Sequence, residues 1–410
     1  MTLPSRENFL RAISLFCGAG IGEFGTKNYW QTVLAVDNWK RACLAFRANH
    51  RGAVVRRADV RSRGLIAWAK RRFGYIDIIM ASPPCPAFSS AKGKQKVNDK
   101  QRRLYFAPLL WVQAFDPKIV VIENVNGIKG KSWLRRMRFR LQRLGYRTTY
   151  WILDAANYGT PQFRKRLFVL AAKGVPLPQK PAPTHGPGLK PYMTLGDAIG
   201  HLTEGEALSM GCDRLSPKRQ WCMESVGPDQ NWEALTGKRR AYALHSVEEK
   251  PLGDLCYRPG YGEPSKTILT GVQQQTTTSH MHPGYKPPGM RYYFRLCHDE
   301  PAPAIMTQVK TERATYTYPG HDGSQRQSVF TKDRRGRVLW DGVPLTNRPL
   351  SVRECLILQG WDGECYWPFR RIGHRYRCVG NGIAVQCMVA VAKEVSAVLL
   401  SERSGCRARQ

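Results

Sequence analysis

One cysteine in the stretch "ASPPCPAFSS", residues 81–90, is placed as a reactive thiol would be. Cys85 lies between two prolines, has a third proline just before them, and follows the apolar run "YIDIIM" at 75–80, which has the composition of a buried strand. Because proline fixes φ, these prolines make the turn rigid. A thiol that only fills a core needs no rigid turn, whereas a nucleophile must be held at a fixed angle. The stretch therefore predicts a nucleophilic cysteine at the end of a strand.

A carboxyl group and two guanidinium groups on later strand runs could assist such a thiol. Glu123 ends the run in "VVIENVNGI". It is either a structural strand-end acid or a general acid that protonates or hydrogen-bonds the group attacked by the thiol. Gln162, Arg164 and Arg166 alternate in "TPQFRKRLFVL", so on a strand both guanidinium groups point one way. They are either surface charge or, beside a Cys and a Glu, ligands of a pyrimidine carbonyl or a phosphate.

The stretch "SLFCGAGIGEFG" at 14–25 has the composition of a ligand-binding loop between a strand and a helix. Gly18 and Gly20 would let the backbone approach a ligand at the carboxyl edge of a sheet. The dinucleotide pattern GxGxxG fails, because Glu23 stands where its third glycine would be. A tight turn without a ligand is the alternative.

Acidic residues at the ends of the next two strand runs make an adenosine cofactor the better interpretation. Asp37 in "AVDNW" is placed to accept both ribose hydroxyls, and Trp39 could lie against an adenine face. Asp59 ends the third run and could accept the adenine amino group. Taken alone, each acid is typical of a strand-end cap. Acids at the ends of successive strands together favour an adenosine cofactor.

The elements that must position these residues alternate between strands and helices. Seven β-branched runs appear in the first 175 residues, at "RAISLF", "TVLAVD", "AVVRRAD", "YIDIIMAS", "KIVVIEN", "TTYWILD" and "RLFVLAA". Helix-length stretches separate most of them, which predicts a mostly parallel α/β sheet whose last two strands are antiparallel. A Pro- and Gly-rich boundary begins at 174, and helical periodicity returns at "SVRECLILQGW" and "GIAVQCMVAVAKEVSAVLL". The second of these predicts a buried helix that packs on the first domain.

Charge and composition restrict the partner. The chain has 410 residues, with 64 Lys and Arg against 31 Asp and Glu, a formal net charge of +33. So large an excess favours nucleic acid, with an anionic membrane as the alternative. No run approaches the roughly 20 apolar residues of a membrane span and no signal peptide is evident, so we expect a cytoplasmic protein. The twelve cysteines form no CxxC pair, which argues against a disulfide framework and a zinc site, and we expect no metal.

The order of the motifs "FCGAG", "PPC", "ENV", "QFRKR", "RPLSVRECLILQGW" and "VGNGIAV" resembles that of the cytosine-C5 DNA methyltransferase family. The resemblance covers the chain outside a long insert. It implies a class I methyltransferase fold, Rossmann-like, with a mostly parallel seven-stranded sheet and an inserted, irregular target-recognition domain. The implied domains are 1–178 with 346–410 for catalysis, and 179–345 for DNA binding.

The resemblance also implies an S-adenosylmethionine cofactor and specific roles. Cys85 matches the family nucleophile, which adds to C6 of a flipped-out cytosine so that C5 can take up the methyl group and give 5-methylcytosine, while Glu123 engages the ring nitrogen. Arg166, and with it Arg164, matches the ligands of the ring carbonyl. The residues that match cofactor positions are Phe16, Gly18, Gly20, Asp37, Trp39, Asp59 and Asn381.

Two positions depart from the pattern of the family. Pro86 replaces the Gln that most members have after the nucleophile, which removes a side-chain contact to DNA and stiffens the turn. Base flipping or target context is therefore expected to differ. Gly382 replaces the more usual Ala or Ser after Asn381, and this change is expected to be harmless.

Two stretches are candidates for DNA contacts. Lys92, Lys94 and Lys96 lie in the basic stretch after the nucleophile and could meet phosphates. Gln273, Gln274 and Gln275 lie in "TGVQQQTTTSH", where amide groups could read adenine edges, although a solvated loop is the alternative.

The sequence thus predicts a sequence-specific DNA (cytosine-5-)-methyltransferase with double-stranded DNA as its partner. We expect a monomer of prokaryotic or phage origin that serves restriction–modification beside a cognate restriction endonuclease. A tRNA cytosine-C5 methyltransferase and a catalytically inactive DNA-binding module are the alternatives. The insert of about 155 residues argues against the first, because it suits a major-groove reader. The intact set of Cys85, Glu123, Arg164 and Arg166 argues against the second.

Overall fold

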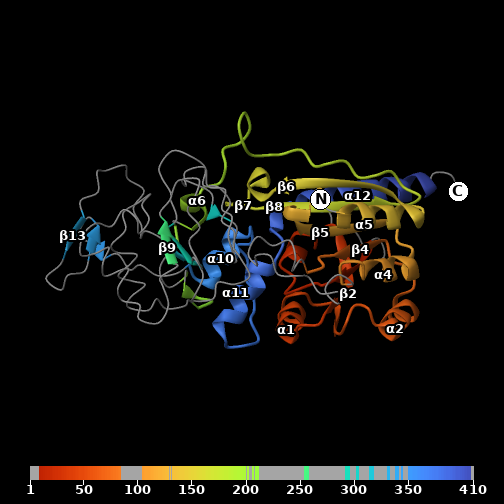
Figure 1. Ribbon diagram of the computed structural model, residues 1–410, viewed down its shortest axis with the longest axis horizontal. Helices are drawn as coiled ribbons and strands as arrows, with labels where there is room; N and C mark the ends of the chain where they lie inside the picture. The colour runs from red at the N-terminus through yellow and green to blue at the C-terminus, as the bar shows by residue number, and fades with distance from the viewer. Residues whose placement is uncertain are drawn as a thin grey trace.

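A computed structural model describes the chain at residues 9–84, 104–128, 130, 132–199, 201–202, 206, 208–211 and 350–407, and adds the backbone of short strands between 254 and 344 (Figure 1). Several predicted site residues lie outside the described residues. They are Cys85, Pro86, Lys92, Lys94, Lys96, Gln273, Gln274 and Gln275.

A seven-stranded sheet in the order β3-β2-β1-β4-β5-β8-β6 forms the centre of the molecule. Its strands are β1 (Leu10–Leu15), β2 (Trp30–Asp37), β3 (Val54–Arg57), β4 (Ile78–Ala81), β5 (Ile119–Val125), β6 (Arg147–Asp154) and β8 (Lys165–Ala172). The strands from β3 to β5 pair in parallel, and β8 pairs antiparallel with both β5 and β6. The seven strand runs expected from sequence are confirmed, as is the antiparallel pair at the end.

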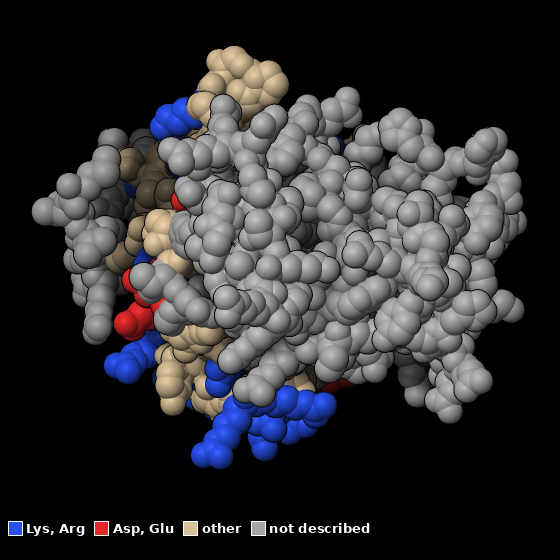
Figure 2. All heavy atoms as spheres, turned by 90° about the vertical axis from the view of Figure 1, so that its left-hand side faces the viewer, with Lys and Arg blue, Asp and Glu red and all other residues tan. Residues whose placement is uncertain are grey.

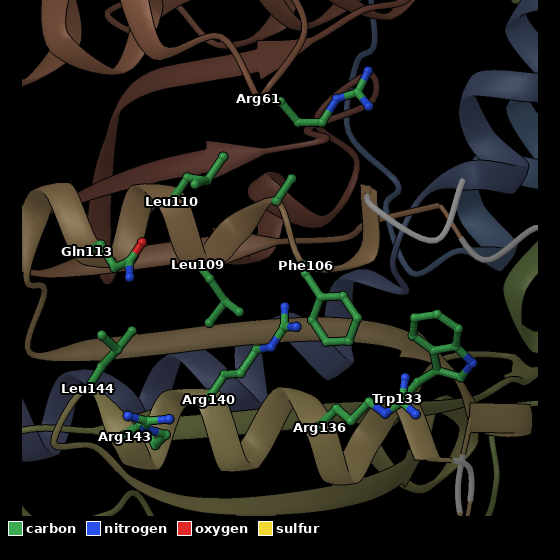
Figure 3. A pocket seen from close by; sticks show the side chains of 11 residues that line it. Arg61, Phe106, Leu109, Leu110, Gln113, Trp133, Arg136, Arg140, Arg143 and Leu144 are labelled. Carbon is green, nitrogen blue, oxygen red and sulfur yellow. The ribbon is translucent and has the colours of Figure 1, made fainter. Parts of the chain in front are cut away.

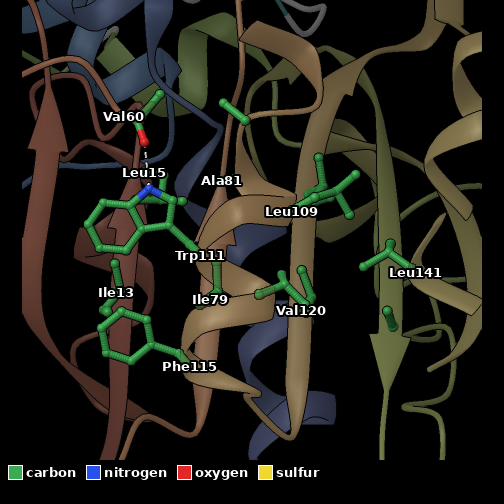
Figure 4. Packing of buried hydrophobic residues seen from close by; sticks show 14 of the residues in the cluster. Ile13, Leu15, Val60, Ile79, Ala81, Leu109, Trp111, Phe115, Val120 and Leu141 are labelled. Atoms are coloured by element: carbon green, nitrogen blue, oxygen red, sulfur yellow. Dashed lines mark hydrogen bonds between the residues drawn. The ribbon is translucent and has the colours of Figure 1, made fainter. Parts of the chain in front are cut away.

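Helices cover both faces of this sheet. On one face lie α2 (Arg63–Phe73), α4 (Pro108–Phe115) and α5 (Ser132–Arg143), which pack on inward side chains such as Ile13, Ile79 and Val120. Figure 4 shows the α4 side chains Trp111 and Phe115 against these strands, with the Trp111 Nε1–H donating to the Val60 carbonyl at 2.7 Å. On the other face lie α1 (Lys40–Asn49) and α12 (Val385–Arg407), as alternation along β2 requires.

The last helix is a core element. Within the described residues, the stretch Ile372–Ser404 is long and apolar enough to cross a membrane by length and composition, which the sequence interpretation did not anticipate. Yet Val391, Ala392 and Val395 are fully buried against Leu10, Ile78 and neighbouring strand residues. Burial of this apolar face in the protein accounts for its composition. The predicted packing of this helix on the first domain is confirmed.

A second core forms where the chain returns from the insert. It joins α10 (Val352–Leu358) and α11 (Ile372–Asn381) to the short helix α6 (Leu195–Ile199). A capping box begins α10, in which the Ser351 hydroxyl accepts from the Glu354 N–H and the Glu354 carboxylate accepts from the Ser351 N–H. The remaining elements are one-turn 3₁₀ helices and short strands: η2 (Gly22–Gly25), η4 (Asn126–Ile128), η5 (Ala155–Tyr158), β7 (Gln162–Phe163), β9 (Asp254–Tyr257), β10 (Arg291–Arg295), β11 (Ala302–Pro303), β12 (Ala314–Thr317), β13 (Phe330–Lys332), β14 (Val338–Trp340) and β15 (Val343–Pro344).

The turn between α11 and α12 packs directly on the loop after β1. A Cβ atom added to Gly382 would lie 2.6 Å from Cβ of Ile21 and 2.9 Å from its Cγ2. Since real Cβ atoms do not approach so closely, only glycine fits here without a shift of the buried Ile21 side chain. Gly382, which was expected to be a harmless departure from the usual pattern, therefore has a steric reason in the packing on Ile21.

A buried carboxyl group lies under the same loop. Glu23 is 5% exposed in η2, and its Oε1 accepts a 2.6 Å hydrogen bond from the Ser14 hydroxyl on β1. Burial raises the pKa of Glu23 to about 7, and the bond from Ser14 opposes this effect only in part. Where the dinucleotide pattern has a third glycine, this chain thus has a carboxyl that ties η2 to the sheet.

Gly382→Ala should lower the free energy of unfolding by about 1–3 kcal/mol, because the added methyl group overpacks against Ile21. Urea denaturation measures this. Gly373→Ala on α11 is the matched control, since its Cβ would meet no atom within 4 Å, and its stability should be unchanged or slightly higher. Equal stabilities for the two variants would contradict the packing described.

Glu23→Gln should remove a pH dependence of stability. The folded-state pKa of about 7 lies above the unfolded value. The stability that Glu23 contributes is therefore fully present below about pH 4.5 and is lost as the pH rises through 7. Between pH 5 and 8 the wild type should lose roughly 2–3 kcal/mol more unfolding free energy than the variant. Chemical denaturation at a series of pH values gives the comparison, and parallel curves would show that Glu23 keeps an ordinary pKa.

Candidate active site

The carboxyl ends of the five parallel strands bring the predicted site residues to one edge of the sheet. Leu15, Asp37, Arg57, Ala81 and Val125 are the last residues of β1 to β5, and parallel strands end at the same edge. The glycine loop, the two acids and the turn that leads to the predicted nucleophile all follow these ends. The edge is the place where open α/β sheets bind ligands.

Glu123 is paired with Arg166 at this edge. Its Oε1 lies 3.1 Å from the Arg166 Nε, and both side chains are mostly buried. Strand pairing explains the contact, because Val125 of β5 lies opposite Arg166 of β8, which puts Glu123 on the diagonal. Burial raises the pKa of Glu123, while Arg166, Arg164 and a hydrogen bond from Ser82 act in the opposite direction.

Asn124, the neighbour of Glu123, holds the start of the proline turn. Its Nδ2 donates to the Pro83 carbonyl at 3.1 Å, and both residues are buried. Its Oδ1 accepts from the N–H of Val125 at 2.8 Å, which fixes the orientation of the amide. The strand that bears the carboxyl is therefore bonded directly to the turn that leads into Cys85.

Arg164 donates to backbone carbonyls and Arg166 pairs with Glu123, although the charges of both act on Glu123. Arg164 lies between β7 and β8, so strand alternation does not govern its side chain. It is 3% exposed, and its Nη2 donates to the carbonyls of Gly380 and Gly382 at 2.9 Å each. Arg166 contacts the predicted acid, whereas Arg164 fastens the turn after α11 to the sheet.

The glycine loop adopts left-handed backbone at three of its residues. Phe16, Gly18 and Gly20 have φ values of 55°, 57° and 80°. For a bulky residue such as Phe16 this conformation is strained, and such strain is concentrated at ligand sites. Gly20 also has no room for a side chain, because an added Cβ would lie 2.3 Å from Nε2 of His50. That nitrogen is within 2.8 Å of the Gly20 carbonyl, and burial lowers the pKa of His50 to about 4.

Asp37 connects the glycine loop to the end of β2. Its Oδ2 accepts from the N–H of Gly18 at 3.0 Å, and its Oδ1 accepts from the N–H of Trp39 at 2.8 Å. Burial raises its pKa, and these bonds act against that effect. The N–H of Asn38 also bonds this carboxylate, so a ribose hydroxyl would use the acceptor capacity that remains. The half-buried carboxylate beside a glycine loop fits the ribose of an adenosine cofactor.

The other predicted cofactor residues have protein partners of their own. The Arg377 guanidinium lies 4.4 Å from the centre of the Trp39 ring, so an adenine could lie only against the opposite ring face. Asp59 forms an exposed ion pair with Arg61, in which Arg61 Nε lies 3.0 Å from Oδ1. Since Arg61 makes two bonds to each carboxylate oxygen, an adenine amino group would have to displace one of them. Asn381 is exposed at the end of α11, next to the Gly382 contact with the glycine loop.

Four residues that contact the candidate site were not predicted from the sequence. Ser82 and Asn124 stand in the quoted motifs but were not assigned roles. His50 and Arg377 belong to no motif, and their contacts with the loop after β1 and with Trp39 arise only from the fold.

Lys and Arg side chains form groups on the surface of the molecule. Figure 2, which looks from the side of the undescribed segment, shows a group of Lys and Arg side chains at the lower edge of this face. Among described residues, the segment 370–377 contains Arg370, Arg371, Arg375 and Arg377. Such groups suit a polyanionic partner.

Comparison with known proteins agrees with the geometry. M.MthTI of Methanothermobacter thermautotrophicus, a Type II methyltransferase, is 26% identical over 391 residues, which are 93% of this chain and 96% of that protein. M.AquIA of Picosynechococcus, also a Type II methyltransferase, is 32% identical over 219 residues, 47% of this chain and 88% of that protein. The match to M.AgeI of Thalassovita gelatinovora is 30% identical, covers 48% of this chain and spans about half of that protein, 51%.

Solved structures confirm the class I methyltransferase fold. A prophage-encoded E. coli protein described as a DNA modification methyltransferase has a TM-score of 0.57 at 16% identity, over 95% of this chain and 99% of that one. A mutant of DNMT2 from Spodoptera frugiperda has a TM-score of 0.57 at 13% identity, over 94% and 99%. The family match itself extends over residues 10–397, with the glycine loop, the Glu123 strand and the returning helices inside it. The chain belongs to the C-5 cytosine-specific DNA methylase family, whose members use S-adenosylmethionine.

Proposed function

We propose that this chain is a sequence-specific DNA (cytosine-5-)-methyltransferase that acts through a covalent adduct of Cys85. The observation that supports it best is the buried Glu123–Arg166 pair, bonded through Asn124 to the proline turn that leads into Cys85. A thiol, a carboxyl and a guanidinium at one edge of the sheet are the groups that this reaction needs.

Carbon 5 of cytosine is a poor nucleophile until a thiolate adds to the ring. In the proposed reaction the Cys85 sulfur bonds to C6 while Glu123 gives a proton or a hydrogen bond to N3, so that C5 gains enamine character. S-adenosylmethionine supplies the electrophilic methyl group that C5 takes up. Loss of the C5 proton to a base and cleavage of the S–C6 bond then restore the aromatic ring and the free thiol. Arg166, held by Glu123, would bind the ring carbonyl, and Arg164 would position rather than contact the base.

The environment of Glu123 suits the role of a proton donor. Burial raises its pKa, which favours the protonated form, and the charges of Arg166 and Arg164 oppose that rise.

The proposed cofactor site joins both ends of the chain. The backbone of Phe16, Gly18 and Gly20 would surround the methionine part, and Asp37 would accept the ribose hydroxyls. Trp39 and Asp59 would bind the adenine, and Asn381 would close the pocket from the turn after α11. We base these assignments on the strained loop and the half-buried carboxylate.

The DNA side of the reaction is also proposed. The target cytosine must leave the duplex stack, at a cost of a few kcal/mol, to meet a buried site. We assign recognition to residues 179–345, with Gln273, Gln274 and Gln275 as candidate base readers, and phosphate contacts to Lys92, Lys94 and Lys96. Type II relatives make restriction–modification the proposed context, with a monomeric enzyme beside a cognate endonuclease.

Cys85→Ser should abolish turnover and retain binding of DNA and cofactor, because only the covalent step needs the thiol. With cofactor present, the wild type should form a denaturation-resistant adduct with a 5-fluorocytosine duplex, and the variant should not. Gel electrophoresis in denaturant detects the adduct. Methyl transfer to DNA without such an adduct would contradict the assignment of Cys85. A parallel assay with tRNA decides the substrate, since transfer to tRNA alone would exclude the DNA enzyme.

Asp37→Ala should weaken S-adenosylmethionine binding by about 1–3 kcal/mol, the cost of leaving buried ribose hydroxyls without an acceptor, and should change DNA affinity little. Calorimetry measures both. Because Asp37 also holds Gly18, the decisive comparison uses a cofactor analogue that lacks the ribose hydroxyls. The wild type should discriminate against this analogue and the variant should not. Equal discrimination by both proteins would place the ribose elsewhere.

A further inference from the structure

A groove of about 800 Å³ lies between α4 and α5, outside the candidate active site. Figure 3 shows Arg136, Arg140 and Arg143 of α5 beneath Leu109 and Gln113 of α4, with Phe106 and Trp133 at one end. We call this feature the α4–α5 groove. Nothing in the proposed reaction uses it.

The positive charge of the α4–α5 groove has little compensation within the protein. The sequence of α5, "SWLRRMRFRLQR", contains five arginines and no acid, and the described residues that line the groove include no acid. Leu134, Met137 and Leu141 form its buried face, so Arg136, Arg140 and Arg143 project outward. Among the described residues, none of these three arginines has a carboxylate partner within 4 Å, whereas Arg61 across the groove is paired with Asp59.

The spacing of the three arginines matches an extended polyanion. They stand at i, i+4 and i+7 on α5, which places them in one row that rises by about 10 Å along the helix. Guanidinium groups bind phosphate oxygens with paired N–H donors. A row of this length can follow several successive phosphates of one strand, which in a duplex recur every 3.4 Å along the axis.

The groove begins beside the active site. Phe106 and Trp133 precede or begin α4 and α5, and the N-terminal ends of such helices lie at the edge where the parallel strands end. Their ring centroids are 5.4 Å apart, and the Arg140 guanidinium lies 4.3 Å from the centre of the Phe106 ring. The arginine at the centre of the row is thereby oriented by an aromatic face. From this end the row leads away from the edge where the target base would enter.

We propose that the α4–α5 groove binds the sugar–phosphate backbone of duplex DNA that flanks the target site, independently of sequence. The inference rests on the proposed function only in that DNA is the substrate. The groove adds affinity and orients the duplex, while base recognition stays with the insert. The absence of acids, the row of outward arginines and the position at the catalytic edge favour DNA over an anionic membrane.

The test compares Arg136→Ala/Arg140→Ala/Arg143→Ala with the control Arg71→Ala/Arg72→Ala/Lys393→Ala, which removes three exposed charges from α2 and α12. Binding to a duplex of about 30 base pairs without a target site is measured by fluorescence anisotropy at several salt concentrations. The groove variant should bind roughly tenfold more weakly at 0.1 M salt, with a salt slope smaller by about 2–3. The control should keep most of the affinity and slope.

Further outcomes separate this inference from the proposed function. An unchanged slope, or an equal loss in the control, would overturn the groove as a DNA site. So would reduced binding to vesicles of anionic lipid with DNA binding intact, which would assign the groove to a membrane. If the wild type methylated no DNA, the proposed function would fail, yet the anisotropy comparison would still decide the groove, because it does not require catalysis.

Discussion

The buried guanidinium of Arg164 joins two segments that lie far apart in the sequence. The Nη2 of Arg164 donates to the carbonyls of Gly380 and Gly382, more than 200 residues away along the chain. Burying a guanidinium is costly unless its donors are paired, so the turn after α11 must stay where these two carbonyls can accept. That constraint places Gly382 against Ile21, starts α12 over the sheet and brings Asn381 to the candidate cofactor site. Arg164 thus fixes the turn that borders the candidate cofactor site.

Burial separates reactive from inert groups in this chain. The structure shows buried cysteines outside any disulfide at 17, 43, 355, 365, 378 and 387. Burial raises the pKa of Cys17 and Cys43, which lie next to the candidate cofactor site, and so suppresses the thiolate. Glu123 is also buried, but an arginine and a serine oppose the effect on its pKa. Reactivity at this edge therefore depends on which buried groups have polar partners, and not on exposure alone.

The sheet was predictable because its strands are short β-branched runs that parallel α/β folds bury on both faces. The glycine loop, Asp37 and Glu123 were predictable for a related reason, since strand order places them at one edge. The two arginines were not distinguishable, because β8 begins at Lys165 and alternation holds for Arg166 but not for Arg164. The partner of Trp39 was also hidden, since Arg377 reaches it only after the chain has returned from the insert. Local pattern fixes elements and edges, whereas side chains that bridge distant segments depend on tertiary packing.

The contact between Gly382 and Ile21 has a consequence for the timing of synthesis. A chain emerging from the ribosome presents the glycine loop long before the turn at 380–382, and α12 follows that turn. Until then, one face of the sheet lacks the helix that covers it, and the cofactor loop lacks its opposite wall. Helix α12 can cover this face of the sheet only after the whole insert has been synthesised. The candidate cofactor site likewise gains its wall at 380–382 only after the insert.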